Sequence, residues 1–143
     1  MNPVLVQLIT AFFGSLGFAL LFGLRRRYLF TASLGGVLAW GIYLAAEGWL
    51  HTVFLPCLLA AAFTVLYAEL LARVFKSPAT LFLIPAIIPL VPGSSLYYAM
   101  SCAVRGELGA ARGYGMLTLK YTLAIAAGIS IVMAFRELRT RQR

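Results

Sequence analysis

Residues 84–100 read IPAIIPLVPGSSLYYAM, and this stretch decides which fold the chain can form. Its helix-breaking residues are three prolines and the glycine that follows them: Pro85, Pro89, Pro92 and Gly93. A proline inside a helix removes one backbone hydrogen bond and clashes with the carbonyl four residues earlier, at a cost of about 3 kcal/mol or more. A regular helix cannot hold three prolines in eight residues, so the sequence predicts a broken helix here.

The rest of the sequence is that of an integral membrane protein. Hydrophobic residues make up 62% of the 143-residue chain and charged residues 11%, with a mean hydropathy of +0.93, whereas soluble domains are about 25% charged. Five apolar stretches are each close to the roughly 20 residues that cross a bilayer as a helix: residues 3–24, 28–46, 52–72, 79–100 and 116–135. We therefore expect one all-α membrane domain over residues 1–143, with about five transmembrane helices and the fourth discontinuous.

The net charge of +8 is also typical of nucleic-acid-binding proteins, but the basic residues lie at the ends of the apolar stretches. This placement indicates membrane orientation instead, because cytoplasmic loops carry an excess of lysine and arginine. With five passes and the N-terminus outside, nine basic residues face the cytoplasm: Arg25, Arg26, Arg27, Arg73, Lys76, Arg136, Arg139, Arg141 and Arg143. Arg105 and Arg112 then lie outside. We expect an external N-terminus, a cytoplasmic C-terminus and no nucleic-acid partner.

Few residues in the chain are suited to catalysis or metal binding. The sequence has four acidic residues, all glutamates, and one histidine. Its two cysteines, Cys57 and Cys102, are far apart and form no metal-binding pair. Almost no hydrolytic or redox constellation can be assembled from these residues. We therefore expect no enzyme activity, no metal and no cofactor.

The broken helix itself is the candidate binding site. Backbone groups freed inside the bilayer must face protein or a watery cavity, and the start of a second half-helix would present free N–H groups and a partial positive charge to a carboxylate. Ser94 and Ser95 can cap this half-helix and add hydroxyl donors. The predicted substrate-binding residues are Pro92, Gly93, Ser94, Ser95, Tyr97, Tyr98 and Lys120. The alternative is a proline-kinked helix that binds no ligand.

Two charged residues within apolar stretches each allow two interpretations. Lys120 lies five residues into the fifth stretch, where it can pair with a substrate carboxylate or extend to the outer interface. Glu69 precedes Arg73 by four residues, a spacing typical of an ion pair on one helical face. If Glu69 is buried instead, it is a candidate for carrying a coupled proton.

Two further features concern packing. Residues 101–115 are mixed in polarity and rich in glycine, which predicts an interfacial turn or short helix on the outer face. Small residues recur at helical spacing in three pairs: Gly14 and Gly17, Ala32 and Gly36, Ala124 and Gly128. Such spacing permits close helix approach in a membrane, so we expect these pairs at helix contacts within one bundle, with a specific dimer interface as the alternative.

The pattern P-x-x-x-P-x-x-P-G-x-x-x-Y, met by Pro85, Pro89, Pro92, Gly93 and Tyr97, resembles the threonine/serine exporter family. More narrowly, it is similar to the small subunit of the split, two-component type, as in succinate exporters. The resemblance implies export of a small carboxylate-bearing metabolite, threonine/serine or a succinate-like dicarboxylate, across the bacterial inner membrane, coupled to the proton gradient. It also implies a larger partner subunit with its own membrane helices. The layout agrees over most of the chain, although residues 3–72 match only as apolar sequence.

Two other functions are compatible with the sequence. The chain can be a membrane scaffold that stabilises the larger subunit without binding substrate, or it can form a passive channel. Because many transporters contain two repeats and no internal repeat is visible here, the chain is also expected to work with a partner or with copies of itself.

Overall fold

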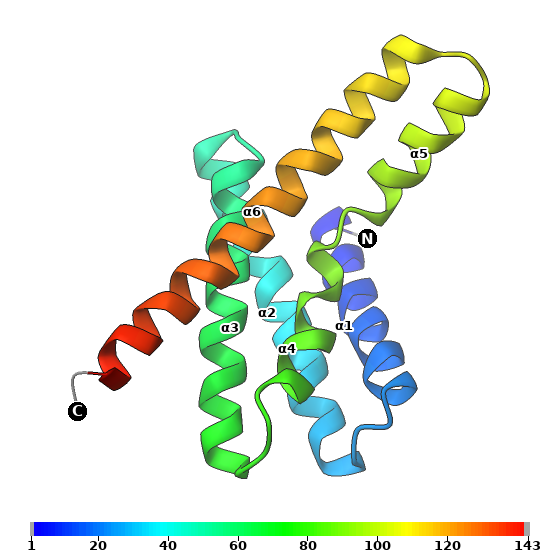
Figure 1. Cartoon of the computed structure of the whole chain (residues 1–143). Coiled ribbons are helices and arrows are strands. Elements are labelled where there is room, and N and C mark those ends of the chain that lie inside the picture. Colours follow the sequence, from blue (N-terminus) through cyan, green and yellow to red (C-terminus); the bar gives the residue numbers. More distant parts are fainter. Residues whose placement is uncertain (1, 142–143) are drawn as a thin grey trace.

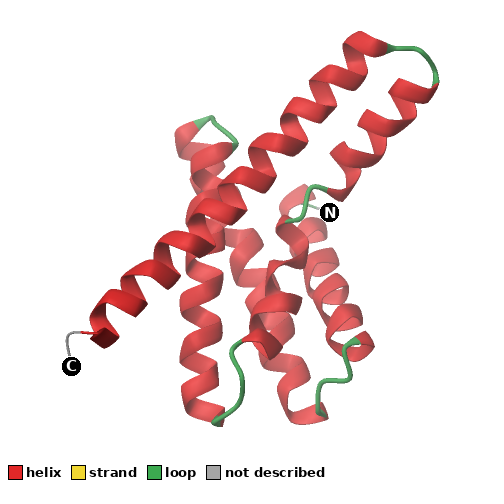
Figure 2. Ribbon diagram, in the orientation of Figure 1, coloured by secondary structure: helices red, strands yellow, loops and turns green. Residues whose placement is uncertain are grey.

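A computed structural model describes residues 2–141 of the chain, and this part is all helical apart from its turns (Figures 1 and 2). In chain order the elements are α1 (Pro3–Leu21), α2 (Arg26–Leu50), α3 (Phe54–Phe75), α4 (Thr80–Ile87), the 3₁₀ helix η1 (Ile88–Leu90), α5 (Gly93–Val104) and α6 (Leu108–Arg141). Gln142 and Arg143 of the basic tail lie outside the described residues, as does Met1.

The helices confirm the predicted fold class. α1, α2, α3 and α6 are long and apolar enough to cross a membrane, and the bent pair of α4–η1 and α5 gives up to five such elements. The helix ends differ from the expected spans, most of all in α6, which begins at Leu108 and not near residue 116. The spans stay predictions, because a helix can continue beyond the hydrocarbon layer.

The segment 101–115 is more regular than predicted. α5 continues to Val104 and α6 begins at Leu108, so only three residues form the turn between them. In this turn Gly106 has a φ of +79°, a conformation that residues with a Cβ rarely adopt. The expected turn is therefore limited to these three residues, and the rest of the segment belongs to the helical hairpin of α5 and α6.

α2 lies at the centre of a bundle formed with α1, α3 and α4 (Figure 1). α6 packs along α3 with its C-terminal part, while its N-terminal part pairs with α5. The hairpin of α5, yellow-green in Figure 1, and the first half of α6, yellow to orange, projects away from the bundle. The break between η1 and α5 therefore separates the bundle from the hairpin.

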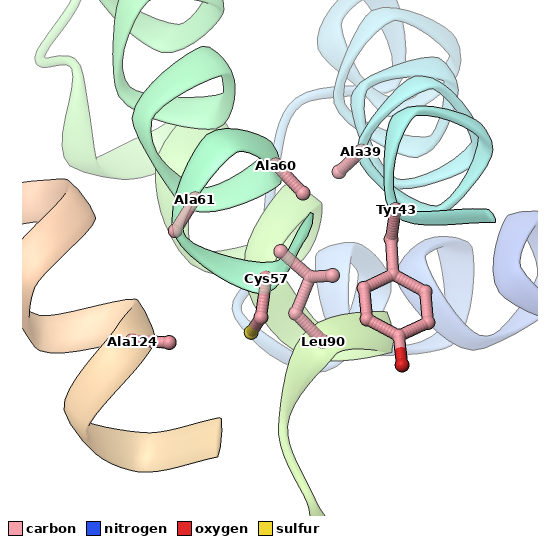
Figure 3. Packing of buried hydrophobic residues seen from close by; sticks show 7 residues of the cluster. All are labelled: Ala39, Tyr43, Cys57, Ala60, Ala61, Leu90 and Ala124. Carbon is pink, nitrogen blue, oxygen red and sulfur yellow. The ribbon is translucent and has the colours of Figure 1, made fainter. Parts of the chain in front are cut away.

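The core beside the break consists mainly of small side chains. Its buried members come from α2, α3, η1 and α6 (Figure 3): Ala39, Tyr43, Cys57, Ala60, Ala61, Leu90 and Ala124. Four alanines let the helix backbones approach closely, which is how helices associate in a membrane without a hydrophobic driving force between them. Leu90 brings the 3₁₀ segment into this core, so the start of the break is held by packing.

A second core lies at the opposite end of the bundle. Its rings are Tyr28, Phe75 and Phe82, with centroid distances of 5.2 Å for Tyr28–Phe75, 5.5 Å for Tyr28–Phe82 and 5.8 Å for Phe75–Phe82. Phe82 is fully buried. This cluster fixes the first turns of α4 against α2 and α3 before the chain reaches the break.

Two of the three predicted small-residue pairs lie at close helix contacts. A Cβ added at Gly36 would lie 1.9 Å from Ser15 Oγ, and one added at Gly128 would lie 2.6 Å from the Leu58 carbonyl oxygen. Ala32 and Ala124, their partners in the sequence pattern, are fully buried. Gly14 and Gly17 have open space around an added Cβ, so the prediction is wrong for this pair.

Candidate functional site

The predicted break is present, and each proline has a distinct place in it. Pro85 lies inside α4, Pro89 lies in the first turn of η1, and Pro92 is the N-cap of α5. The axes before and after the break differ by 51°. Proline at the start of a helix costs no hydrogen bond, which explains why the chain resumes a helix directly after the third proline.

The backbone between the two halves is tightly turned. Val91 is extended, with a ψ of 125°, and the Gly93 N–H donates to the Val91 carbonyl oxygen at 2.8 Å. The Leu96 N–H donates to the Pro92 carbonyl oxygen at 3.1 Å. The amides of Ser94 and Ser95 belong to the first turn, whose N–H groups have no acceptor within the helix. A helix N-terminus therefore lies at Gly93, where the sequence predicts the start of the second half-helix.

The predicted capping by the serines is wrong. α5 has no side-chain cap, and the Ser95 hydroxyl instead donates to the Pro92 carbonyl oxygen at 3.2 Å. Ser95 is buried, whereas Gly93 and Ser94 are exposed. Because the N-cap is a proline, no side-chain oxygen accepts from the amides of Ser94 and Ser95, and these two amides can donate to another acceptor.

The two halves of the broken element have different surroundings. Phe82, Pro85, Ala86 and Leu90 are buried in the bundle, and α2 makes room for them with small residues. A Cβ added at Gly35 would lie 2.9 Å from Ala86 Cβ. α5, by contrast, leaves the bundle and packs only on α6 among the helices it contacts closely. The buried half of the broken element is therefore the part before Pro92.

The predicted tyrosines lie on the projecting hairpin. Tyr97 and Tyr98 are exposed, with 67% and 51% of their surface accessible. Their rings are 5.6 Å apart, and Tyr98 is 5.4 Å from Tyr114 of α6. Of the predicted site residues, Tyr97 and Tyr98 therefore lie on the same half-helix as Gly93, Ser94 and Ser95. Neither tyrosine lines the hollow of about 210 Å³ at Pro89.

Lys120 is exposed on α6 at the level of the α5 N-terminus. Gly93 lies 11 residues before the end of α5, and Lys120 lies 12 residues after the start of α6. At 1.5 Å per residue, both are about 17 Å from the turn of the antiparallel hairpin. Lys120 and the N-terminus of α5 therefore lie at about the same distance from the turn of the hairpin.

A hollow that the sequence did not predict lies where α1, α2 and η1 meet. It has a volume of about 210 Å³ and is lined by Gln7, Thr10, Ala11, Trp40 and Pro89. The Trp40 indole N–H donates to Gln7 Oε1 at 3.4 Å across α1 and α2. Gln7 and Thr10, two of the three polar side chains in the first helix, were the signal in the sequence that could have indicated this site.

The ion pair of Glu69 is not the predicted one. Arg136 Nη1 donates to Glu69 Oε1 at 2.9 Å, so the pair joins α3 to α6 and does not connect Glu69 to Arg73. The Glu69 side chain is only 13% exposed. The partner is 67 residues away in sequence, which is why helical spacing alone selected the wrong arginine.

A second polar cluster connects α2 with α6 at the opposite end of the bundle. The Tyr43 hydroxyl lies 2.7 Å from the Tyr121 hydroxyl and donates to Glu47 Oε1 at 3.1 Å. The Trp40 ring stacks on Tyr43 at 5.0 Å. Tyr43 therefore holds Glu47 directly, while Tyr121 contacts only the Tyr43 hydroxyl. Across the described residues, no group of three histidine, cysteine or acidic side chains could hold a metal ion.

An all-helical bundle with four or five membrane-length elements, one of them interrupted where free amides face outward, has the architecture of a polytopic membrane transporter. The sequence comparison identifies the family. The model of the family described as "Threonine/Serine exporter, ThrE" matches residues 7–135, and the chain belongs to this family. No curated protein and no solved structure matches the chain.

Proposed function

We propose that the chain is the small subunit of an exporter of small carboxylate-bearing metabolites, either threonine and serine or a succinate-like dicarboxylate. It acts in the bacterial inner membrane with a larger subunit of the same family. The observation that carries the proposal is the coincidence of the family match over residues 7–135 with a helix interrupted at Pro85–Gly93, where discontinuous helices of transporters bind their substrates.

The proposed substrate position is the N-terminus of α5. Its first amides and the positive end of the helix dipole favour a carboxylate, and Gly93 and Ser94 are exposed, so a solute can reach them. Lys120 at the same level of the hairpin adds a full positive charge. Tyr97 and Tyr98 supply phenol groups on the same half-helix.

The distribution of charge supports an external N-terminus. The α1–α2 turn with Arg25 and the α3–α4 turn with Lys76 lie at one end of the bundle (Figure 1). The contact between Arg136 and Glu69 near the end of α3 brings the basic tail toward this same end. Cytoplasmic loops are the ones enriched in lysine and arginine, so this end faces the cytoplasm in the proposal.

The projecting hairpin supports a partner with its own membrane helices. Gly109 and Gly113 of α6 are four residues apart, and an added Cβ at either would meet no atom within 4 Å. Glycines at this spacing permit close approach of a second helix. Leu108 is 73% exposed and Val104 is 89% exposed beside them. A helix of the larger subunit, or a copy of this chain, would cover this surface.

The test is export from cells that lack this chain, the larger subunit, or both, measured over a panel containing threonine, serine and succinate. We expect loss of either subunit to abolish efflux of the same solute and re-expression of both to restore it. Efflux that persists without this chain would contradict the proposal. Full efflux after disruption of the break would indicate a scaffold, and efflux unaffected by an uncoupler would indicate a passive channel.

A further inference from the structure

Three consecutive arginines lie at the end of the bundle that carries the α1–α2 and α3–α4 turns (Figure 1). Arg25, Arg26 and Arg27 are exposed at the start of α2. In the described part of the chain, none of the three forms an ion pair with a carboxylate. Because α2 is long enough to cross a membrane, its first residues lie at the level of the lipid headgroups. Their charge is therefore open to a partner outside the chain.

One of these arginines is fixed in position. The Arg27 guanidinium carbon lies 4.5 Å from the centroid of the Tyr28 ring, and Arg27 Nη2 donates to the Tyr28 hydroxyl. A guanidinium has five N–H donors in a planar fork, so this bond leaves the other donors unused. Since Arg27 is exposed, an oxyanion can reach these donors, and a guanidinium binds such a group through two parallel hydrogen bonds.

A chain of hydrogen bonds positions this guanidinium. The Ser77 hydroxyl donates to the Phe75 carbonyl oxygen at 3.1 Å and lies 3.0 Å from the Tyr28 hydroxyl. Because a serine has a single hydroxyl proton, the Tyr28 hydroxyl donates to Ser77, and its oxygen accepts from Arg27. Tyr28 is buried, and its ring packs on Phe75 and Phe82. The α3–α4 turn thus orients Arg27 through Tyr28.

The charge at the start of α2 has the wrong sign for a helix N-terminus. The first turn has no acidic residue, and the N-cap Arg25 makes no side-chain hydrogen bond to it. Positive charge is unfavourable there because the helix dipole is also positive at this end, and the first amides have no acceptor within the helix. An anion beside Arg26 and Arg27 would offset both effects.

Exposed apolar side chains border the arginines. At the end of α1, Leu21 is 78% exposed and Phe22 is 52% exposed, and Phe30 in the first turns of α2 is 65% exposed. In a membrane such side chains contact acyl chains. A molecule with an anionic headgroup and acyl chains therefore matches both parts of this surface, whereas a free anion would match the arginines alone.

We propose that Arg27, assisted by Arg25 and Arg26, binds the phosphate of an anionic phospholipid whose acyl chains lie along the exposed apolar side chains of α1 and α2. Phosphatidylglycerol is a lipid of this class. Because Arg27 is connected to the α3–α4 turn through Tyr28 and Ser77, the bound lipid would stabilise the contact between the two turns. The site involves no exported solute, so it goes beyond the proposed function and does not depend on it.

Native mass spectrometry of the purified full-length chain tests this site. The two probes are phosphatidylglycerol and phosphatidylcholine with identical acyl chains, so only the headgroup differs. We expect phosphatidylglycerol to bind at least tenfold more tightly, since each arginine near an anionic headgroup contributes about fivefold. Equal affinities would overturn the proposal. Displacement of phosphatidylglycerol by inorganic phosphate would also overturn it, because the site would then be one for a free anion.

Tyr28→Phe separates a built site from general attraction between charges. The variant keeps the ring and the net charge but removes the hydroxyl that positions Arg27, and we expect phosphatidylglycerol to bind about fivefold more weakly, the effect of one hydrogen bond. Tyr67→Phe is the matched control, because the Tyr67 hydroxyl also joins α3 to α2, by donating to the Thr31 carbonyl oxygen at 2.7 Å. It should bind the lipid as the wild type does. Wild-type affinity in Tyr28→Phe would overturn the proposal.

A second pair of variants keeps the test decisive if Tyr28→Phe does not fold. Arg27→Gln removes the oriented guanidinium and should weaken binding of phosphatidylglycerol about fivefold. Arg105→Gln removes the same charge from an exposed position at the end of α5 and should leave the affinity unchanged. Equal losses in the two variants would mean that net charge alone attracts the lipid, and the proposal would be wrong.

Discussion

Arg136 of α6 donates to Glu69 of α3 at 2.9 Å, and this ion pair joins two helices that pack against each other. Glu69 is largely covered, whereas the Arg136 side chain is 57% exposed. The pair therefore gives Glu69 a structural role. That Glu69 also carries a coupled proton stays a prediction.

Glu69→Gln separates the two roles. If the ion pair is structural, the variant loses about 0.2–1 kcal/mol of stability, as expected for a partly exposed pair, and its export remains sensitive to an uncoupler. Thermal unfolding in detergent and efflux with and without the uncoupler measure the two effects. Efflux that proceeds but no longer responds to the uncoupler would assign the coupled proton to Glu69.

The contact of Gly128 with α3 should be intolerant of any side chain. Gly128→Ala places a Cβ 2.6 Å from the Leu58 carbonyl oxygen and 3.0 Å from Ala61 Cβ, so α6 must shift, and we expect a loss of about 1–3 kcal/mol of stability. The change is measured as a lowered unfolding temperature of the purified chain.

The matched control for Gly128→Ala is Gly113→Ala on the same helix. An added Cβ at Gly113 meets no atom within 4 Å, and alanine has the higher helix propensity by about 1 kcal/mol. This variant should be neutral or more stable. Equal stability losses in the two variants would mean that α6 does not pack on α3 through Gly128.

Sequence patterns predicted the elements that depend on local chemistry. The three prolines determined the break, and the apolar stretches determined the number of helices. The α5–α6 hairpin was missed because the glycines of residues 106–115 each disfavour a helix by about 1 kcal/mol relative to alanine. The antiparallel contact of α5 with α6 outweighs this cost, and no local pattern reports such a contact.

The site was predictable only on one side of the break. Gly93 and Ser94 follow the prolines directly, so their position at a helix start could be derived. The hollow combines Gln7, Trp40 and Pro89 from three elements, and tertiary packing alone brings them together. For the same reason the partner of Glu69 was assigned to the nearest arginine in the same helix and not to Arg136.

Gly93→Val tests the proposed carboxylate position. An added Cβ at Gly93 meets no atom within 4 Å, so the variant should fold and assemble with the larger subunit. The branched side chain would nevertheless obstruct access to the first amides of α5, and we expect at least a tenfold loss of export. Efflux is compared with the amount of assembled complex recovered by co-purification.

Gly48→Val is the control for this substitution, since Gly48 is also open around an added Cβ and lies at the end of α2, away from the break. It should export normally. Wild-type efflux in Gly93→Val would exclude the α5 N-terminus as the substrate site. Lost assembly in Gly93→Val but not in Gly48→Val would instead support the scaffold function.

Lys120→Met should weaken binding of the solute carboxylate. Lys120 lies at the depth of the α5 N-terminus, and removing its charge leaves only the partial charge of the helix dipole. We expect the KM for export to rise about tenfold, the cost of one charge-assisted hydrogen bond, with little change in the amount of protein in the membrane. Lys120→Arg keeps the charge and should keep most of the affinity, while Lys76→Met removes a charge from the α3–α4 turn and should leave the KM unchanged. Because a lysine that only extends to the interface would be replaced by methionine without effect on the KM, the comparison of the three variants decides between the two interpretations of this residue.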